Sequence, residues 1–169
     1  MLHTFLKTPI GMLLLAGDGH ALSCVGFPGG SRAMQPKPQW PRDDAAFQLA
    51  RTELTAYFTG ALTEFTVPLA PSGTPFQLAV WAALRDIPYG ATASYGELAN
   101  RIGRPSASRA VGAANGANPL PIIIPCHRVI GSSGALTGFG GGLDTKRWLL
   151  HHEREANRPA ALQAEFAFG

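Results

Sequence analysis

Apolar and polar positions alternate loosely along the first 28 residues, which are rich in strand-forming side chains. Two apolar runs, at residues 12–16 and 21–27, flank the dipeptide Asp18-Gly19. An Asp-Gly pair between apolar runs is a strong signal for a β-hairpin turn. Residues 28–42 hold many prolines and glycines and predict an irregular loop. We therefore expect the chain to begin with antiparallel strands.

After this loop the apolar positions take helical spacing. One face carries five of them: Phe47, Ala50, Leu54, Tyr57 and Phe58. Asp43 or Asp44 can cap this helix, and Gly60 can end it. The pattern predicts a helix to about residue 58 that covers the small sheet.

A strand and a chain break follow this helix. Residues 64–69 predict a further strand, and Pro71-Ser72-Gly73 then interrupts the pattern. We place a domain boundary at this break. It divides the chain into an N-terminal α/β lobe, residues 1–73, and a C-terminal domain, residues 74–169.

Helical patterns dominate the C-terminal domain. Thr74-Pro75-Phe76-Gln77 has the form of a capping box, and the helix that it begins must stop before Pro88. Ser94 or Thr92 can cap the next helix. Further helices are expected at residues 95–102, 107–114 and 145–155. A glycine-containing turn joins the first two of these, which is typical of a helix-turn-helix. The predicted fold is α+β, with an antiparallel sheet and helix followed by a mainly helical lobe.

The second helix of this pair is unusual because its side chains are nearly all small. They are Ala107, Ala110, Gly112, Ala113 and Ala114. Small residues let a backbone approach its partner closely. Only Glu97 opposes the nearby basic residues, which are Arg101, Arg104, Arg109 and Arg128. Such a surface suits nucleic-acid phosphates, although charge alone fits an ordinary solvated face equally well.

Composition narrows the classes of protein that remain. With 169 residues, 15% of them charged, and a net charge of +3, the chain fits a mildly basic globular protein. Cys24 and Cys126 are too few for a disulfide framework, and no Cys/His spacing indicates a metal. The start of the chain lacks signal-peptide features, and no apolar run has membrane-spanning length. We expect a cytoplasmic protein without a membrane partner.

The candidate chemistry centres on Pro125-Cys126-His127. The Ile-Ile-Ile run at residues 122–124 predicts a short buried strand or extended segment, and Pro125 stiffens its end. Core packing is the plain alternative for a free cysteine. Glu153 lies beside the buried stripe of the final helix, where a carboxylate needs a partner such as a histidine. Together Cys126, His127 and Glu153 supply a thiol, a base and an orienting carboxylate.

Five smaller expectations concern the last third of the chain. Asp144 can cap the final helix, and His151 and His152 are expected to face solvent. The glycine-rich residues 136–142 lack the Gly-Lys-Ser/Thr of a phosphate-binding loop, so we expect no nucleotide cofactor. They favour a mobile loop that closes over a flat ligand. The tail after residue 156 is expected to be weakly ordered.

The residues around Cys126 resemble a known family. The pentad Pro125-Cys126-His127-Arg128-Val129 follows Asn118-Pro119 and precedes Ser132-Ser133-Gly134 and Gly141-Gly142-Leu143. Upstream, the matching segments are Phe76-Gln77, Val80-Trp81, Ile87-Pro88-Tyr89-Gly90, Ser94-Tyr95 and Arg109-Ala110-Val111-Gly112. Here the chain resembles the O(6)-alkylguanine-DNA alkyltransferases (methylated-DNA–protein-cysteine methyltransferases). The resemblance covers residues 74–153 well and the first lobe only in outline.

This resemblance implies a DNA repair protein that acts once. Cys126 would accept the alkyl group from O-6 of guanine, and also from O-4 of thymine, in duplex DNA. His127 would deprotonate Cys126 through a water, while Glu153 holds the imidazole. Asn118 would brace the turn around the cysteine, and Tyr95 would protonate the departing guanine.

Other residues are implied in binding the base and the DNA. The contacts of the base would be Val129, Phe139, Gly140 and Pro121. The contacts of the DNA, which a monomer would bind through the minor groove, would be Arg109, Ala110, Gly112, Ala113, Asn115 and Arg128. Arg109 would fill the place of the flipped nucleotide. Phe139 stands where many members have tyrosine, and Gly140 where some have serine. No cofactor or metal is implied.

Two other functions remain open at this stage. A non-catalytic protein that binds alkylated bases is one, but such relatives carry tryptophan in place of Cys126. A cysteine hydrolase that uses Cys126, His127 and Glu153 is the other, and the helix-turn-helix with Arg109 argues against it.

Overall fold

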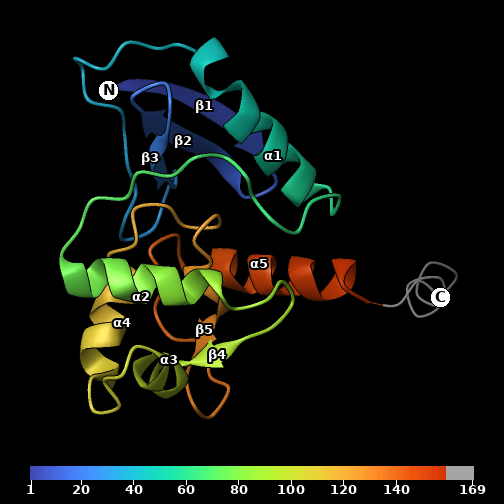
Figure 1. Cartoon of the computed structure of the whole chain (residues 1–169). Helices are drawn as coiled ribbons and strands as arrows, with labels where there is room; N and C mark the ends of the chain where they lie inside the picture. The colour runs from blue at the N-terminus through green and yellow to red at the C-terminus, as the bar shows by residue number, and fades with distance from the viewer. Residues whose placement is uncertain (159–169) are drawn as a thin grey trace, which may run out of the picture.

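Three antiparallel strands open the computed structural model, which describes residues 1–158 (Figure 1). They are β1 (Leu2–Thr8), β2 (Gly11–Gly17) and β3 (Leu22–Gly26), hydrogen-bonded in the order β1-β2-β3. Asp18 Oδ1 closes the turn between β2 and β3 by accepting from two backbone N–H groups, each at 2.8 Å. The predicted hairpin is confirmed, and residues 28–42 form a loop without helix or strand.

A helix covers this sheet, as the apolar spacing predicted. A short 3-10 turn, η1 (Ala45–Phe47), leads directly into α1 (Gln48–Phe58). Asp43 accepts from the N–H of Ala46 at 3.2 Å, and Asp44, at the N-cap of the turn, accepts from a threonine hydroxyl of β1 at 2.6 Å. Neither aspartate caps α1 itself, whose N-cap is Phe47. Gly60 has a φ of +81° and ends the helix in the left-handed conformation that glycine adopts easily.

The segment after α1 is not a strand, so the prediction for residues 64–69 is wrong. The backbone N–H groups of Thr66 and Val67 donate to the buried carboxylate of Glu53, each at 3.0 Å. Pro68 has no N–H to donate. A side chain therefore satisfies the backbone groups that a neighbouring strand would otherwise bind.

Helices build the second half of the described chain. They are α2 (Pro75–Arg85), α3 (Tyr95–Arg101), α4 (Ser108–Gly116) and α5 (Leu143–Ala156). A short parallel pair, β4 (Ala93–Ser94) and β5 (Val129–Ile130), lies among them. The capping box forms in both directions between Thr74 and Gln77, at 3.2 and 3.0 Å, and Ser94 caps α3. The predicted helix-turn-helix, α3 and α4, is confirmed.

The start of α5 differs from the prediction. Gly142 stands at its N-cap, and Asp144 lies in the first turn, where it pairs with Arg147 at 2.7 Å. In Figure 1, α2 and α5 cross the middle of the molecule, between the sheet with α1 and the lower helix α3. Apolar side chains from both halves form one buried cluster. The predicted α+β fold is confirmed, and most of the tail after residue 156 lies outside the described residues.

Candidate active site

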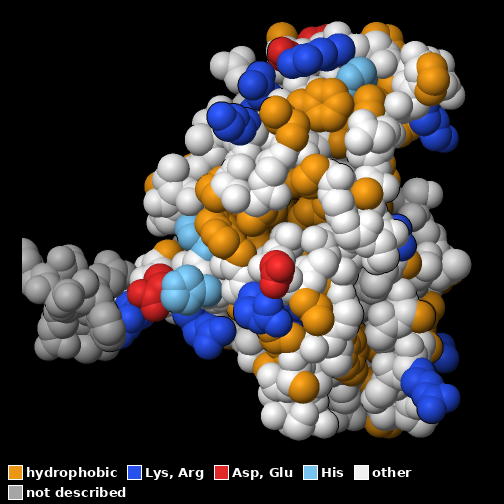
Figure 2. Space-filling model, turned by 180° about the vertical axis from the view of Figure 1, so that it is seen from behind, with side chains coloured by type: hydrophobic (Ala, Val, Ile, Leu, Met, Phe, Trp, Pro, Cys, Tyr) orange, Lys and Arg blue, Asp and Glu red, His pale blue; other side chains and the backbone are white. Residues whose placement is uncertain are grey.

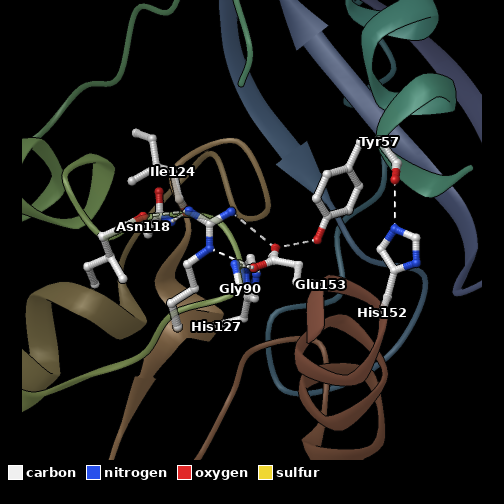
Figure 3. A network of polar contacts seen from close by, with 9 residues as sticks. Tyr57, Gly90, Asn118, Ile124, His127, His152 and Glu153 are labelled. Atoms are coloured by element: carbon white, nitrogen blue, oxygen red, sulfur yellow. Dashed lines mark hydrogen bonds and ion pairs between the residues drawn. The ribbon is translucent and has the colours of Figure 1, made fainter. Parts of the chain in front are cut away.

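The chain before Cys126 forms a tight turn. It is buried as predicted, but it is not a strand, because the N–H of Ile124 donates to the carbonyl of Leu120 at 2.8 Å and Ile122 has a φ of +76°. A positive φ is strained for a β-branched residue, so surrounding contacts must hold it. Asn118 donates to the carbonyl of Ile124 at 2.8 Å (Figure 3) and accepts from the N–H of Leu120 at 2.9 Å. This geometry fits the bracing role predicted for Asn118.

Cys126 begins a 3-10 turn, η2 (Cys126–Arg128), and lines a small cavity. Pro121, Phe139 and Gly140, the predicted neighbours of a bound base, line the same cavity. Its volume is about 40 Å³, which is room for a few water molecules.

One wall of this cavity comes from the loop after β3, to which the sequence assigned no role. Arg32 and Met34 line the cavity, and the N–H of Arg32 donates to the carbonyl of Gly140 at 3.0 Å. Phe27 meets Phe139 edge to face, with ring centroids 5.4 Å apart. These contacts hold the glycine-rich segment against the N-terminal sheet.

His127 and Glu153 meet inside the protein. His127 Nε2 lies 2.6 Å from Glu153 Oε2, and the two side chains are 0% and 1% exposed. Burial alone would raise the pKa of Glu153, but hydrogen bonds from His127 and Arg128 outweigh it and hold that pKa well below its usual range. Burial lowers the pKa of His127, although Glu153 offsets part of this effect.

The protonation of His127 follows from this pairing. The ionised carboxylate keeps a proton on Nε2, and the lowered pKa keeps the ring neutral. Nδ1 is buried and has no hydrogen-bond partner among residues 1–158. It is therefore an unoccupied acceptor on the residue next to Cys126, which suits a general base.

Arg128 also belongs to this buried ion pair, so its predicted place on the DNA-facing surface is wrong. Its Nε donates to Glu153 Oε1 at 2.7 Å, and its Nη2 donates to Oε2 at 3.2 Å. Its Nη1 donates to the carbonyl of Ile87 at 2.7 Å. Only 6% of the residue is exposed, which leaves no guanidinium face for a phosphate.

Two groups outside the predicted triad also face Glu153 (Figure 3). Tyr57 of α1 donates its hydroxyl to Oε2 at 2.7 Å, and the N–H of Gly90 lies 3.5 Å from Oε1. His152 Nε2 lies 2.7 Å from the carbonyl oxygen of Tyr57. His152 thus connects α5 to α1, which differs from the prediction that it faces solvent. His151 is exposed, as predicted.

Lys146 is a buried cation that was not predicted from the sequence. It has no exposed surface, and its Nζ donates to the carbonyls of Val129 at 2.6 Å and Thr137 at 3.4 Å. Burial raises the pKa of Cys126 to about 11, while a hydrogen bond with Asn118 and the charge of Lys146 oppose this rise. The thiol is therefore protonated at neutral pH and needs a base before it can react.

Tyr95 and Val129 do not line the cavity that contains Cys126. Tyr95 begins α3, and its hydroxyl hydrogen-bonds to that of Thr137. Val129 is fully buried, and Lys146 binds its carbonyl. In this arrangement the Tyr95 hydroxyl and the Val129 carbonyl each have a hydrogen-bond partner within the protein.

The outer face of α4 carries most of the residues predicted to contact DNA. Those that are exposed or partly exposed are Arg109, Ala110, Gly112 and Ala113. Figure 2 shows basic side chains at the corner of the molecule where α3 and α4 lie. Asn115 is buried instead, lines the cavity, and donates to the carbonyl of Cys126 at 3.4 Å. Its predicted place on the DNA-facing surface is wrong, because it lies on the inner face of the helix.

Cys24 and Cys126 are both buried free thiols. Residues 1–158 hold no group of three or more His, Cys, Asp or Glu side chains placed to bind a metal ion. None of the helices in this range is long and apolar enough to cross a membrane.

Two family models match the chain in succession. Residues 1–71 match the model described as 6-O-methylguanine DNA methyltransferase, ribonuclease-like domain. Residues 75–155 match 6-O-methylguanine DNA methyltransferase, DNA binding domain. The resemblance drawn from the residues around Cys126 is confirmed, and it extends to the first lobe.

Individual relatives agree with these models. A methylated-DNA–protein-cysteine methyltransferase of Methanosarcina acetivorans is 50% identical over 153 residues, which are 90% of this chain and 98% of the relative. One of Mycobacterium tuberculosis is 52% identical over 158 residues, or 93% and 94% of the two chains. The crystal structure of Mycobacterium tuberculosis OGT in complex with DNA matches with a TM-score of 0.87 and 50% identity, over 92% of this chain and 94% of that one. The chain belongs to the 6-O-methylguanine DNA methyltransferase family.

Proposed function

We propose that the chain is a methylated-DNA–protein-cysteine S-methyltransferase that repairs O(6)-alkylguanine, and also O(4)-alkylthymine, in double-stranded DNA. Cys126 keeps the alkyl group, so each molecule acts once. The observation that carries this proposal is Cys126 on the wall of a cavity, next to a neutral His127 that Glu153 holds. Relatives about half identical over most of their length carry this name, and one is crystallised with DNA.

The first step is formation of a thiolate, because a thiol is a poor nucleophile. His127 takes the proton of Cys126 on Nδ1 through a bridging water. Glu153 stabilises the resulting imidazolium through Nε2, at 2.6 Å. The positive charge of Lys146, which opposes the rise in the pKa of Cys126, favours the thiolate further.

The second step is displacement at carbon. The thiolate of Cys126 attacks the alkyl carbon, the S–C bond forms as the C–O bond breaks, and the electron pair leaves on the guanine. Tyr95 donates a proton to this poor leaving group and regains one from solvent. Its hydroxyl is hydrogen-bonded to that of Thr137, which can donate to it and leave the tyrosine proton available. The thioether has no water-labile bond, and Cys126 is not regenerated.

The target base must leave the duplex to reach Cys126. The small outer face of α4 suits the minor groove, where Arg109 fills the space of the flipped nucleotide. The flipped base reaches Cys126 through the cavity that Arg32 and Gly140 line. One copy of the chain carries the cavity, the general base His127 and the DNA-binding helix α4, so we assign a monomer.

We also keep the division into a lobe at residues 1–73 and a DNA-binding and alkyltransferase domain at residues 74–169. The two matching family models meet between residues 71 and 75, which supports this boundary. Free Cys24 and Cys126 suit the reducing cytoplasm.

A mass measurement tests this function. The protein is incubated with a duplex that carries one O(6)-methylguanine, and its peptides are then weighed. We expect one added methyl group, on Cys126, with guanine restored in the DNA and no second turnover. Cys126→Ser should gain no methyl group, whereas Cys24→Ala, which alters the other buried thiol, should react like the wild type.

The same incubation, together with an assay on a small ester or amide, separates the alternatives. Binding of the methylated duplex without an adduct on Cys126 would identify a non-catalytic binder of alkylated bases. Repeated turnover of a small ester or amide through Cys126 would identify a hydrolase. Either result would overturn the proposed function.

A further inference from the structure

Glu153 is held from both halves of the molecule. His127 and Arg128 come from the segment of Cys126, but Tyr57 lies in α1, 96 residues before Glu153. Tyr57 is fully buried, and its hydroxyl donates to Glu153 Oε2 at 2.7 Å. Figure 3 shows its ring reaching from α1 toward the carboxylate on α5.

Tyr57 and His127 bind the same oxygen of this carboxylate. Oε2 accepts from His127 Nε2 at 2.6 Å and from the Tyr57 hydroxyl at 2.7 Å, while Oε1 accepts from Arg128 Nε at 2.7 Å. Each donor reduces the negative charge that the carboxylate presents to the others. The tyrosine hydroxyl therefore limits how strongly Glu153 attracts the imidazolium form of His127.

The surroundings fix Tyr57 in this position. Its ring centroid lies 5.2 to 6.2 Å from those of its aromatic neighbours, which are Phe58, Phe65, Tyr89 and His152. Its backbone carbonyl is held by His152 Nε2 at 2.7 Å. Burial, followed by the charge of Glu153, raises the pKa of Tyr57. Its hydroxyl therefore stays protonated, and remains a donor, over the pH range in which a cysteine titrates.

We propose that Tyr57 is a positioning residue of the N-terminal lobe that acts through Glu153 to set the basicity of His127. The inference rests on the proposed role of Cys126 as the alkyl acceptor. It gives the sheet and α1 a part in the reaction, because their packing on α5 delivers the hydroxyl to the carboxylate. Without this hydroxyl, Glu153 favours protonated His127 more strongly, and the thiolate of Cys126 forms at lower pH.

The test measures the rate at which iodoacetamide alkylates Cys126 as a function of pH. Peptide masses separate Cys126 from Cys24. Tyr57→Phe removes one oxygen, and we expect its profile to move to lower pH, with alkylation about threefold faster at a fixed pH below the midpoint. Tyr89→Phe is the matched control, because it removes the same atom from a neighbouring ring whose hydroxyl has no hydrogen-bond partner among residues 1–158. Its profile should coincide with that of the wild type.

A second comparison asks whether the effect passes through Glu153. In a Glu153→Gln background, Tyr57→Phe should no longer move the profile. An unchanged profile in Tyr57→Phe, a move to higher pH, an equal move in Tyr89→Phe, or a move that persists beside Glu153→Gln would each overturn the proposal. If Glu153→Gln does not fold, the pair of tyrosine variants decides alone. Iodoacetamide needs no DNA, so a wild type that takes no methyl group would refute the proposed function and leave this comparison readable.

Discussion

Lys146 Nζ lies 2.6 Å from the carbonyl oxygen of Val129, which is three residues beyond Cys126. The lysine side chain is fully buried. No carboxylate among residues 1–158 forms an ion pair with it. Buried charges in proteins are usually paired, so burying this ammonium group without a carboxylate costs folding free energy. Its position next to the segment of Cys126 suggests a function for it. Its charge opposes the rise in the pKa of Cys126 that burial causes.

Lys146→Met should slow methyl transfer by raising the pKa of the Cys126 thiol. A shift of one pH unit corresponds to about a tenfold lower rate at neutral pH. The deficit should shrink as pH rises, because the thiolate then forms in both proteins. Single-turnover rates across pH check this, with Lys7→Met, an exposed lysine of β1, as the control. A deficit that stays constant with pH would mean lost packing and would contradict the electrostatic role.

The helices were predictable because their start signals are local. The capping box at Thr74 and the cap at Ser94 need only neighbouring residues. The two strand predictions that failed were overridden by side chains that bind the backbone groups. Glu53 takes the N–H groups of residues 66 and 67, and Asn118 helps to bend the isoleucine run into a turn. Composition favours a strand in both places, and these side-chain hydrogen bonds override it.

The candidate site was predictable where a motif or an apolar stripe carries it. Glu153 lies on such a stripe. Lys146 lies seven residues earlier on the same helical face, so its burial could have been predicted from the same spacing. Arg128 was misplaced because a count of charges does not reveal burial. Tyr57 was placed correctly on a buried face, but its bond to Glu153 depends on how α1 packs against α5.

Acid should destabilise the protein through Glu153 and His127. Both have folded-state pKa values below their ordinary values of 4.5 and 6.5, so the unfolded chain binds more protons as pH falls. The free energy of unfolding should therefore decline below about pH 6.5 and more steeply below 4.5, toward the folded-state pKa values. Urea unfolding across this range measures it. Glu153→Gln should show a shallower decline below pH 4.5, where Asp44 also contributes, and an equally steep decline in that variant would rule out a contribution of Glu153.

Asn118→Ala should weaken both the fold and the reaction. It removes two hydrogen bonds of the strained turn at Ile122, and it leaves the buried N–H of Leu120 without a partner, while the carbonyl of Ile124 keeps the N–H of Cys126. Such a change costs about 2–4 kcal/mol in the free energy of unfolding. Asn100→Ala, on the exposed side of α3, should change it by less than about 0.5 kcal/mol. Unaltered alkylation of Cys126 in a destabilised Asn118→Ala protein would contradict the bracing role.

Arg109→Ala should separate reaction with duplex DNA from reaction with a free base. The side chain is exposed on α4, outside the cavity of Cys126, and its proposed work is to fill the gap that a flipped nucleotide leaves. Transfer from O(6)-methylguanine in a duplex should slow by about tenfold or more, which corresponds to about 1.4 kcal/mol of lost stabilisation. Reaction with free O(6)-benzylguanine needs no base flipping and should change little. Arg154→Ala, which removes an exposed arginine of α5, controls for general attraction of phosphates. Equal losses on both substrates would refute the role of Arg109 in flipping, because only the duplex has a gap to fill.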